Sequence, residues 1–134
     1  MSGLSEAFDA WSKLLGSAAV VRPCFELDSL GRTTQARAPG GSQPLLGALR
    51  PRSRDELPAL LAIAREHRIK LHQSSAGKSW GLGTRRAAEE AVLLDLSGLR
   101  RISDFDAQLG AIDVEPGVTF QQLYDYLKTQ RSRF

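Results

Sequence analysis

A stretch rich in glycine and serine, placed between two apolar segments, constrains the fold most strongly. Residues 74–84 have the sequence SSAGKSWGLGT, with three glycines and three serines and with neither helical nor strand periodicity. The segments before and after it, Ile69 to Gln73 and Ala91 to Leu96, are strand candidates. Open α/β sheets bind their ligands at the carboxyl ends of parallel strands. The sequence therefore predicts a loop with a binding role at one edge of a parallel sheet.

A helix before the first of these strands completes a βαβ unit. Residues Ala48 to Pro51 predict a short strand that ends at proline. Ser53 and Glu56 then have the spacing of a capping box, which marks the start of a helix. The apolar residues that follow at helical spacing are Leu57, Leu60, Leu61 and Ala64. Strand, helix and strand within about thirty residues form a βαβ unit, which implies a parallel pair of strands.

The amino-terminal part begins with a second amphipathic pattern. Phe8, Trp11 and Leu15 lie at positions i, i+3 and i+7, the spacing of one helix face. Ser5 has the chemistry of a helix cap, and Gly16 that of a helix end. We expect a helix between these two residues.

The pattern after this helix divides the chain into two parts. Residues 18–27 predict an extended piece, and residues 28–44, rich in Gly, Ser, Thr, Arg and Pro, predict a long surface loop. Loops of this length inside a domain are uncommon and often act as a lid or a strap. We therefore assign residues 1–47 to an amino-terminal helix and extended loop, and residues 48–134 to the main domain.

Turn signals and one more strand follow residue 95. The pair Ser97-Gly98 and the segment Asp106 to Gly110 both predict turns. Ala111 to Val114 predicts a strand, and Ile102 and Phe105 are expected to be partly buried.

A second capped helix follows that strand. Thr119 and Gln122 have capping-box spacing. The residues expected to form its apolar face are Phe120, Leu123 and Leu127. Together the elements predict an α+β fold, in which a small parallel βαβ lobe is followed by the start of a second, mixed-sheet lobe.

Charge and cysteine content exclude several classes of protein. The 18 Lys and Arg residues are nearly balanced by 15 Asp and Glu residues, and the arginine clusters are interleaved with acids, so we expect no nucleic-acid partner. The single Cys24 excludes an internal disulfide and a cysteine-based zinc site, and we expect no metal.

The longest apolar run, Ala91 to Leu94, is far too short to span a membrane, and no signal peptide is evident. The expected location is cytoplasmic, with no membrane partner.

The glycine-rich stretch has the chemistry to bind phosphate, although it matches neither common nucleotide motif. Glycines expose main-chain N–H groups that can converge on phosphate oxygens, and Lys78 adds a positive charge. The P-loop pattern requires a glycine where His72 stands, and the dinucleotide fingerprint requires one where Arg86 stands. We expect a phosphate-binding loop of another kind, with a plain connector between strands as the simpler alternative.

Three stretches, taken in order, resemble a known family. They are residues 50–53 with the leucine-rich helix behind them, residues 75–83, and residues 95–99 running on to residues 114–119. In this order and spacing they resemble the FAD-binding domain of the p-cresol methylhydroxylase and vanillyl-alcohol oxidase family. The resemblance covers about Leu49 to Leu127, which is most of the chain.

The resemblance implies a set of cofactor-binding residues. In such proteins the glycine-rich loop binds the FAD pyrophosphate mainly through main-chain N–H groups, and a Pro-Gly-Val turn lies beside the flavin. The positions that match here are Ser75, Ala76, Gly77, Lys78, Ser79, Gly81 and Leu82 in the loop, and Pro116, Gly117 and Val118 in the turn. Some relatives attach FAD covalently through a histidine in this loop, where Lys78 stands here, so non-covalent binding is implied. A turn that only leads into the next helix is the simpler interpretation of residues 115–117.

The resemblance further implies a flavin-dependent oxidoreductase that acts on an alcohol, a phenol or a hydroxy acid. The residues that react with substrate lie downstream in such proteins, so no catalytic residue is assigned and the 134-residue chain is expected to be catalytically incomplete. A small-molecule substrate, and pairing with a missing carboxyl-terminal portion or with a second copy, are the expected partners. Two alternatives stay open: a nucleoside-triphosphate-binding module that uses Gly77-Lys78-Ser79, and a truncated, non-catalytic fragment with exposed apolar surface.

Overall fold

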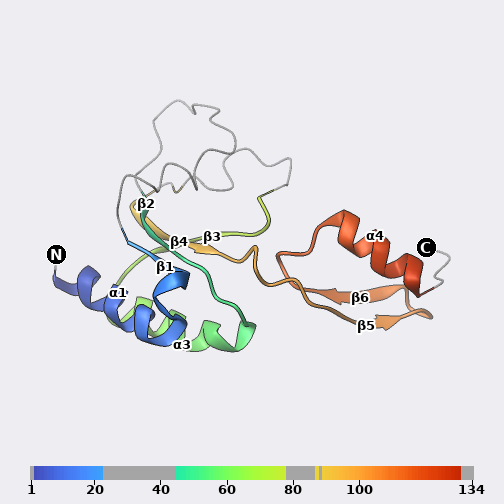
Figure 1. The fold of residues 1–134 in the computed structure, drawn as a ribbon, viewed down its shortest axis with the longest axis horizontal. Coiled ribbons are helices and arrows are strands. Elements are labelled where there is room, and N and C mark those ends of the chain that lie inside the picture. Colours follow the sequence, from blue (N-terminus) through green and yellow to red (C-terminus); the bar gives the residue numbers. More distant parts are fainter. Residues whose placement is uncertain (1, 23–44, 78–86, 88, 131–134) are drawn as a thin grey trace, which may run out of the picture.

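The computed structural model describes residues 2–22, 45–77, 87 and 89–130, and shows a sheet with two helices, followed by a hairpin and a third helix (Figure 1). The elements in chain order are α1 (Ser2–Leu15), the 3-10 turn η1 (Ser17–Ala19), β1 (Val20–Val21), β2 (Leu45–Leu49), the 3-10 turn η2 (Arg54–Glu56), α3 (Leu57–Glu66), β3 (Leu71–Ser74), β4 (Ala91–Asp95), β5 (Ile102–Asp106), β6 (Ala111–Val114) and α4 (Phe120–Thr129). The predicted loop over residues 28–44 lies outside the described residues. The combination of helices with a mixed four-stranded sheet and a separate antiparallel pair confirms the predicted α+β class.

The four-stranded sheet has the order β1-β2-β4-β3. Strands β2, β4 and β3 run parallel to one another, and β1 pairs antiparallel with β2. The crossover from β2 through α3 to β3 is the predicted βαβ unit, but its two strands do not pair with each other, because β4 lies between them. Strand β4 is buried along its whole length, and the central position is the one that buries a strand on both sides.

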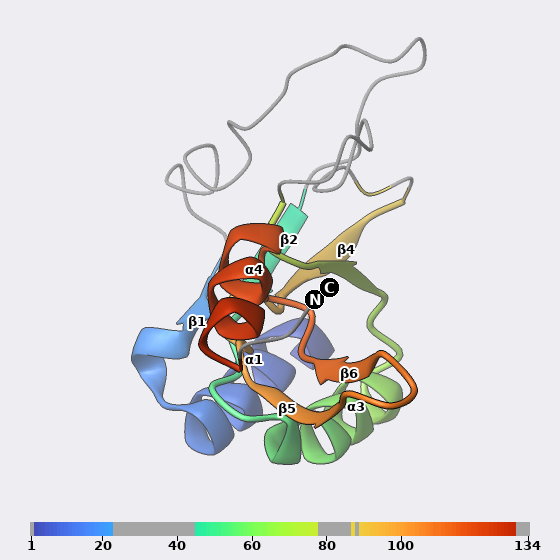
Figure 2. The same ribbon diagram turned by 90° about the vertical axis from the view of Figure 1, so that its right-hand side faces the viewer.

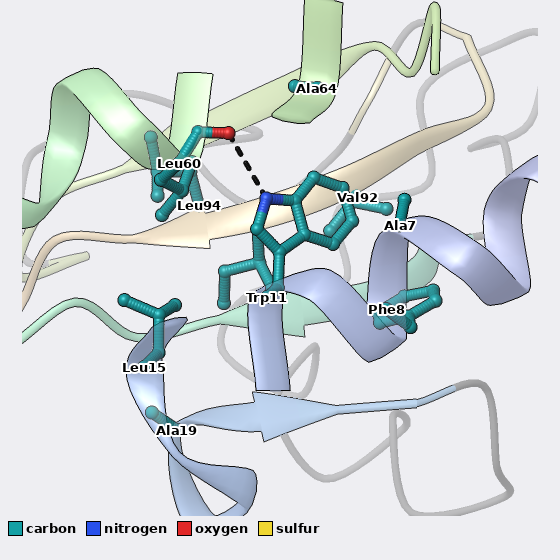
Figure 3. Close-up of a cluster of buried hydrophobic side chains, with 10 residues drawn as sticks. Ala7, Phe8, Trp11, Leu15, Ala19, Leu60, Ala64, Val92 and Leu94 are labelled. Atoms are coloured by element: carbon teal, nitrogen blue, oxygen red, sulfur yellow. Dashed lines mark hydrogen bonds between the residues drawn. The ribbon is translucent and has the colours of Figure 1, made fainter. Parts of the chain in front are cut away.

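Helices α1 and α3 cover the same face of this sheet (Figures 1 and 2). Their core is built around Trp11, which makes an edge-to-face contact with Phe8 at a centroid distance of 5.5 Å (Figure 3). The Trp11 indole N–H donates to the Leu60 carbonyl oxygen over 3.1 Å, which satisfies the buried indole and ties α1 to α3. The burial predicted for one face of α1, including Leu15, is confirmed.

A glycine in β2 allows α1 to approach the sheet closely. Gly47 has a φ of 150°, and a Cβ atom added to it would lie 2.3 Å from the Phe8 ring and 2.6 Å from the Val21 carbonyl oxygen. The amino-terminal helix therefore shares its core with residues beyond 48. The division of the chain at residues 47 and 48 stays a prediction.

The helix ends agree with the sequence at three of four predicted positions. Gly16 (φ 84°) ends α1, and the Ser53–Glu56 and Thr119–Gln122 capping boxes both form. The predicted cap at Ser5 is wrong, because α1 begins one turn earlier, at Ser2. The apolar face also begins earlier, since Leu4 packs against the core.

Strands β5 and β6 form a separate antiparallel pair, with α4 beside them (Figure 2). The predicted turn over residues 106–110 is confirmed, and the Asp106 Oδ1 atom accepts from the backbone N–H groups of Gln108 and Leu109. Partial burial of Ile102 and Phe105 is confirmed as well, within a strand that the sequence analysis did not predict.

The predicted apolar face of α4 is only partly correct. Leu123 and Leu127 are half-buried, but the Phe120 side chain is 91% exposed. Phe120 is the first residue of the helix, and none of the described elements packs over it. Helical spacing shows that residues share a face, but burial also requires a neighbouring element against that face.

Candidate functional site

Three parallel strands end side by side and bring three polar residues into one row. Ser74, the last residue of β3, pairs in register with Asp95, the last residue of β4. Leu49 of β2 pairs with Leu94, so the next residue, Arg50, stands beside Asp95. This carboxyl edge of the sheet is where parallel sheets place their ligands.

Asp95 is the buried charge of this edge. Its side chain is 3% exposed, and its two oxygens accept hydrogen bonds from the Arg50 Nε atom (3.2 Å) and the Ser97 backbone N–H (3.1 Å). A buried carboxylate is costly unless it is paired and hydrogen-bonded, and both conditions are met here. The Arg50 side chain remains 45% exposed, so the pair lies at the boundary between core and solvent.

The glycine-rich loop leaves the sheet at this edge. Ser75, Ala76 and Gly77 follow β3 directly and are half-buried. Gly77 has a φ of 68°, a left-handed backbone conformation that favours glycine. The other predicted loop positions, Lys78, Ser79, Gly81 and Leu82, lie outside the described residues. The start of the predicted phosphate-binding loop is thus at the edge where a ligand is expected.

The second predicted group, Pro116 to Val118, forms the turn between β6 and α4. The Gly117 N–H donates to the Leu99 carbonyl oxygen over 2.7 Å. A Cβ atom on Gly117 would lie 2.5 Å from the carbonyl oxygens of both Leu99 and Ser97. Only glycine fits this close approach, which seats the turn on the segment that leaves β4.

Glu115 holds the same turn from its other side. Its Oε2 atom accepts from the Arg101 backbone N–H over 2.7 Å, and its own N–H donates to the Arg101 carbonyl oxygen over 2.9 Å. The Val118 N–H then donates to the Glu115 carbonyl oxygen over 3.0 Å. The glutamate therefore fixes where the turn starts relative to β5.

These contacts connect the two groups of residues that the sequence analysis singled out. The Leu96 N–H donates to the carbonyl oxygen of Ser74, the residue just before the glycine-rich loop, over 2.8 Å. Leu96 begins the same segment on which Gly117 rests. Loop and turn are therefore attached to neighbouring strand ends, although some forty residues separate them in the chain.

The Arg50–Asp95 pair is the feature that sequence reasoning missed. In the sequence, Arg50 belongs to a charge-balanced arginine cluster, and Asp95 lies within the predicted strand Ala91 to Leu96 and begins the third stretch of the resemblance, so neither residue had a predicted partner. A lone aspartate directly after the run AVLL was the available signal, because a charge at the end of a fully apolar strand needs a partner.

A hollow lies on the outer face of α3, away from the sheet edge. The residues that line it are Pro58, Leu61, Ala62, Arg65, Glu66 and Arg68. It contains none of the predicted site residues. Among the described helices, none is long and apolar enough to cross a membrane.

The architecture and motifs define an FAD-binding domain. Residues 45–134 match the family described as "FAD binding domain", and the chain belongs to this family. It is 36% identical over 132 residues to 1'-carboxy-chondrochloren decarboxylase of Chondromyces crocatus, covering 97% of this chain and 24% of that protein. Over 75 residues it is 33% identical to the flavoprotein subunit of 4-cresol dehydrogenase [hydroxylating] from Pseudomonas putida, covering 55% and 14% of the two chains.

Solved structures agree with this assignment. Substrate-bound p-cresol methylhydroxylase superposes with a TM-score of 0.83 at 25% identity, over 98% of this chain and 25% of that chain. The 4-ethylphenol oxidase of Gulosibacter chungangensis, in complex with isoeugenol, gives a TM-score of 0.84 at 23% identity with the same coverage. The resemblance found in the sequence is confirmed, and FAD is the cofactor of the domain family. The chain spans about a quarter of the length of these relatives.

Proposed function

We propose that this chain forms the amino-terminal part of the FAD site of a flavin-dependent oxidoreductase. The observation that carries the proposal is the close contact of Gly117 with the Ser97 and Leu99 carbonyl oxygens, just after β4. Because of this contact, the turn that we propose to face the flavin lies near the strand end from which the glycine-rich loop begins. FAD supplies the redox chemistry when bound, and the protein binds, orients and shields it.

The loop after β3 is proposed to bind the pyrophosphate. Ser75, Ala76 and Gly77 have small side chains, which leave their main-chain N–H groups accessible to phosphate oxygens. Lys78, Ser79, Gly81 and Leu82 continue the proposed loop, and Lys78 would add a positive charge. A lysine at that position supports non-covalent binding.

The turn formed by Pro116, Gly117 and Val118 is proposed to lie against the flavin. Its backbone is fixed on both sides, by Leu99 through the Gly117 N–H and by Glu115 through the Val118 N–H. A turn held in this way loses little conformational entropy when a ligand binds, which favours affinity.

The complete protein is proposed to oxidise an alcohol, a phenol or a hydroxy acid of small size. The names 4-cresol dehydrogenase and 4-ethylphenol oxidase support the phenol class among these. The chain covers about a quarter of such relatives, so the residues that contact the substrate are proposed to belong to the remaining part.

Isothermal titration of the 134-residue chain with FAD tests the proposal, with ATP plus magnesium as the parallel titration. We expect saturable binding of FAD and no magnesium-dependent binding of ATP. Near-UV circular dichroism, to which the buried Trp11 contributes, verifies before FAD is added that the chain is folded. A folded chain that binds no FAD would contradict the proposal, and a response to ATP with magnesium would favour the triphosphate-binding alternative.

A further inference from the structure

We propose that Arg50 and Asp95 are positioning residues that hold the start of the glycine-rich loop, residues 75–77, and the Gly117 turn in a fixed relation to each other. The inference rests on the proposed function for its effect on FAD affinity. Its structural part, a coupling between Arg50 and the Gly117 turn, is independent of FAD.

The first link fixes Arg50 in the fold. Its backbone N–H donates to the Ala19 carbonyl oxygen over 2.8 Å, and the next residue, Pro51, is fully buried. The guanidinium group therefore extends from a rigid point at the end of β2. Only its Nε atom is engaged within the described residues, and the partner is the buried carboxylate of Asp95.

The second link runs from Asp95 to the segment after β4. The other carboxylate oxygen of Asp95 accepts from the Ser97 N–H, and the Leu99 N–H closes the turn by donating to the Leu96 carbonyl oxygen over 3.1 Å. The same segment is tied to the strand before the glycine-rich loop through the Leu96 N–H and the Ser74 carbonyl oxygen. A rotation of the Asp95 carboxylate would therefore change the path of this segment.

The third link reaches the proposed flavin-facing turn. Gly117 rests on the carbonyl oxygens of Ser97 and Leu99, and the space between them is too small even for a methyl group. A seat with so little free space transmits small displacements, because packed atoms cannot absorb them. Loss of the Arg50 contact should thus disturb the Gly117 turn. Among the described residues, Arg50 itself makes no hydrogen bond to that turn.

The variants that test this chain of contacts are Arg50→Met, Arg50→Lys and the control Arg54→Met. Methionine keeps much of the side-chain length but removes the donor, whereas lysine keeps a charged donor. Arg54 lies in η2, is exposed, and has no side-chain hydrogen bond or ion pair among the described residues, so its replacement removes the same charge without the contact.

Hydrogen exchange of the Gly117 amide, measured by NMR without FAD, tests the coupling directly. We expect faster exchange at Gly117 in Arg50→Met, an intermediate rate in Arg50→Lys, and the parent rate in Arg54→Met, while core amides of β4 keep their protection in all three. If Arg50→Met fails to fold, Arg50→Lys carries the test. An unchanged Gly117 rate in the folded Arg50 variants would overturn the proposal.

FAD titration of the same proteins tests the functional part. We expect about tenfold weaker binding in Arg50→Met, which corresponds to losing one hydrogen bond to a charged group, partial recovery in Arg50→Lys, and parental affinity in Arg54→Met. Equal FAD affinity in all variants would overturn the functional part of the inference. Absence of FAD binding by the parent chain would instead contradict the proposed function, and the exchange experiment would still decide the coupling.

Discussion

At the scale of single residues, the candidate site depends on atoms that fit closely rather than on unusual chemistry. Gly117 leaves no room for a side chain, and Asp95 is buried only because two donors satisfy it. Both residues stand at the carboxyl edge of the sheet. Their contribution is to fix the backbone of the turn that we propose to face the flavin.

Replacement of Gly117 by alanine should be costly for this reason. A methyl group 2.5 Å from two carbonyl oxygens forces the turn away from its seat, and overpacking of this kind costs about 1–3 kcal/mol. We expect a lower free energy of unfolding, measured by urea denaturation, and weaker FAD binding by titration. Gly98→Ala is the matched control, because its nearest neighbour, the Pro51 carbonyl oxygen, lies at 3.5 Å, an ordinary contact distance. Similar losses in both variants would contradict this account of the Gly117 seat.

At the scale of elements, the two capping boxes have the same chemistry but different surroundings. Ser53 begins the turn that leads into α3, which buries Leu60 and Ala64 in the core. Thr119 begins α4, which has no fully buried residue. Loss of the cap should therefore change the stability of the molecule differently at the two helices.

We expect Ser53→Ala to lower the global free energy of unfolding by about 1 kcal/mol, the usual contribution of a helix cap. Thr119→Ala should mainly increase fraying of α4, because little of the core depends on that helix. Urea denaturation monitors the first effect, and amide exchange within α4 monitors the second. The opposite distribution, with a global loss only in Thr119→Ala, would show that α4 is more tightly integrated than its exposure indicates.

The sequence could predict those features of the helices, strands and turns that depend on residues close together along the chain. Capping residues, turn residues and the apolar run of β4 all act within a few positions, and apart from the cap at Ser5 each was predicted correctly. The order of strands, the exposure of Phe120 and the partner of Asp95 depend on which distant segments come together. No spacing along the chain records that β4 lies between β2 and β3, or that Arg50 stands beside Asp95.

At the scale of the whole molecule, the two lobes differ in how well their apolar groups are covered. The sheet with α1 and α3 encloses a continuous core (Figure 3). The hairpin and α4 instead carry the larger number of exposed apolar side chains, which are Leu109, Val114, Phe120 and Tyr124. The glycine-rich loop follows β3 in the first lobe, and the turn joins β6 to α4 in the second. Among the described residues, only the first lobe has a buried hydrophobic core.

This asymmetry predicts self-association of the isolated 134-residue chain through the hairpin and α4. Apolar side chains that no element of the chain covers favour contact with another apolar surface. We expect sedimentation velocity to show concentration-dependent association that Phe120→Ser reduces without lowering stability, since Phe120 is 91% exposed. Leu61→Ser, which alters an exposed leucine on α3, serves as the control and should leave association unchanged. Equal association of the parent and Phe120→Ser proteins would exclude this surface as the contact.

The strand order has a consequence for how the chain is made. Strand β4 is the last of the four along the chain, yet it is the one that pairs with both β2 and β3. During synthesis, β2 and β3 leave the ribosome before the strand that will join them, and they have no parallel partner until residue 95 has emerged. Chains fold as units once their contacts are available, and unpaired strand edges are prone to aggregation in the meantime. A nascent chain of this protein should therefore acquire protease resistance abruptly, at the length that releases β4, rather than gradually with each added element.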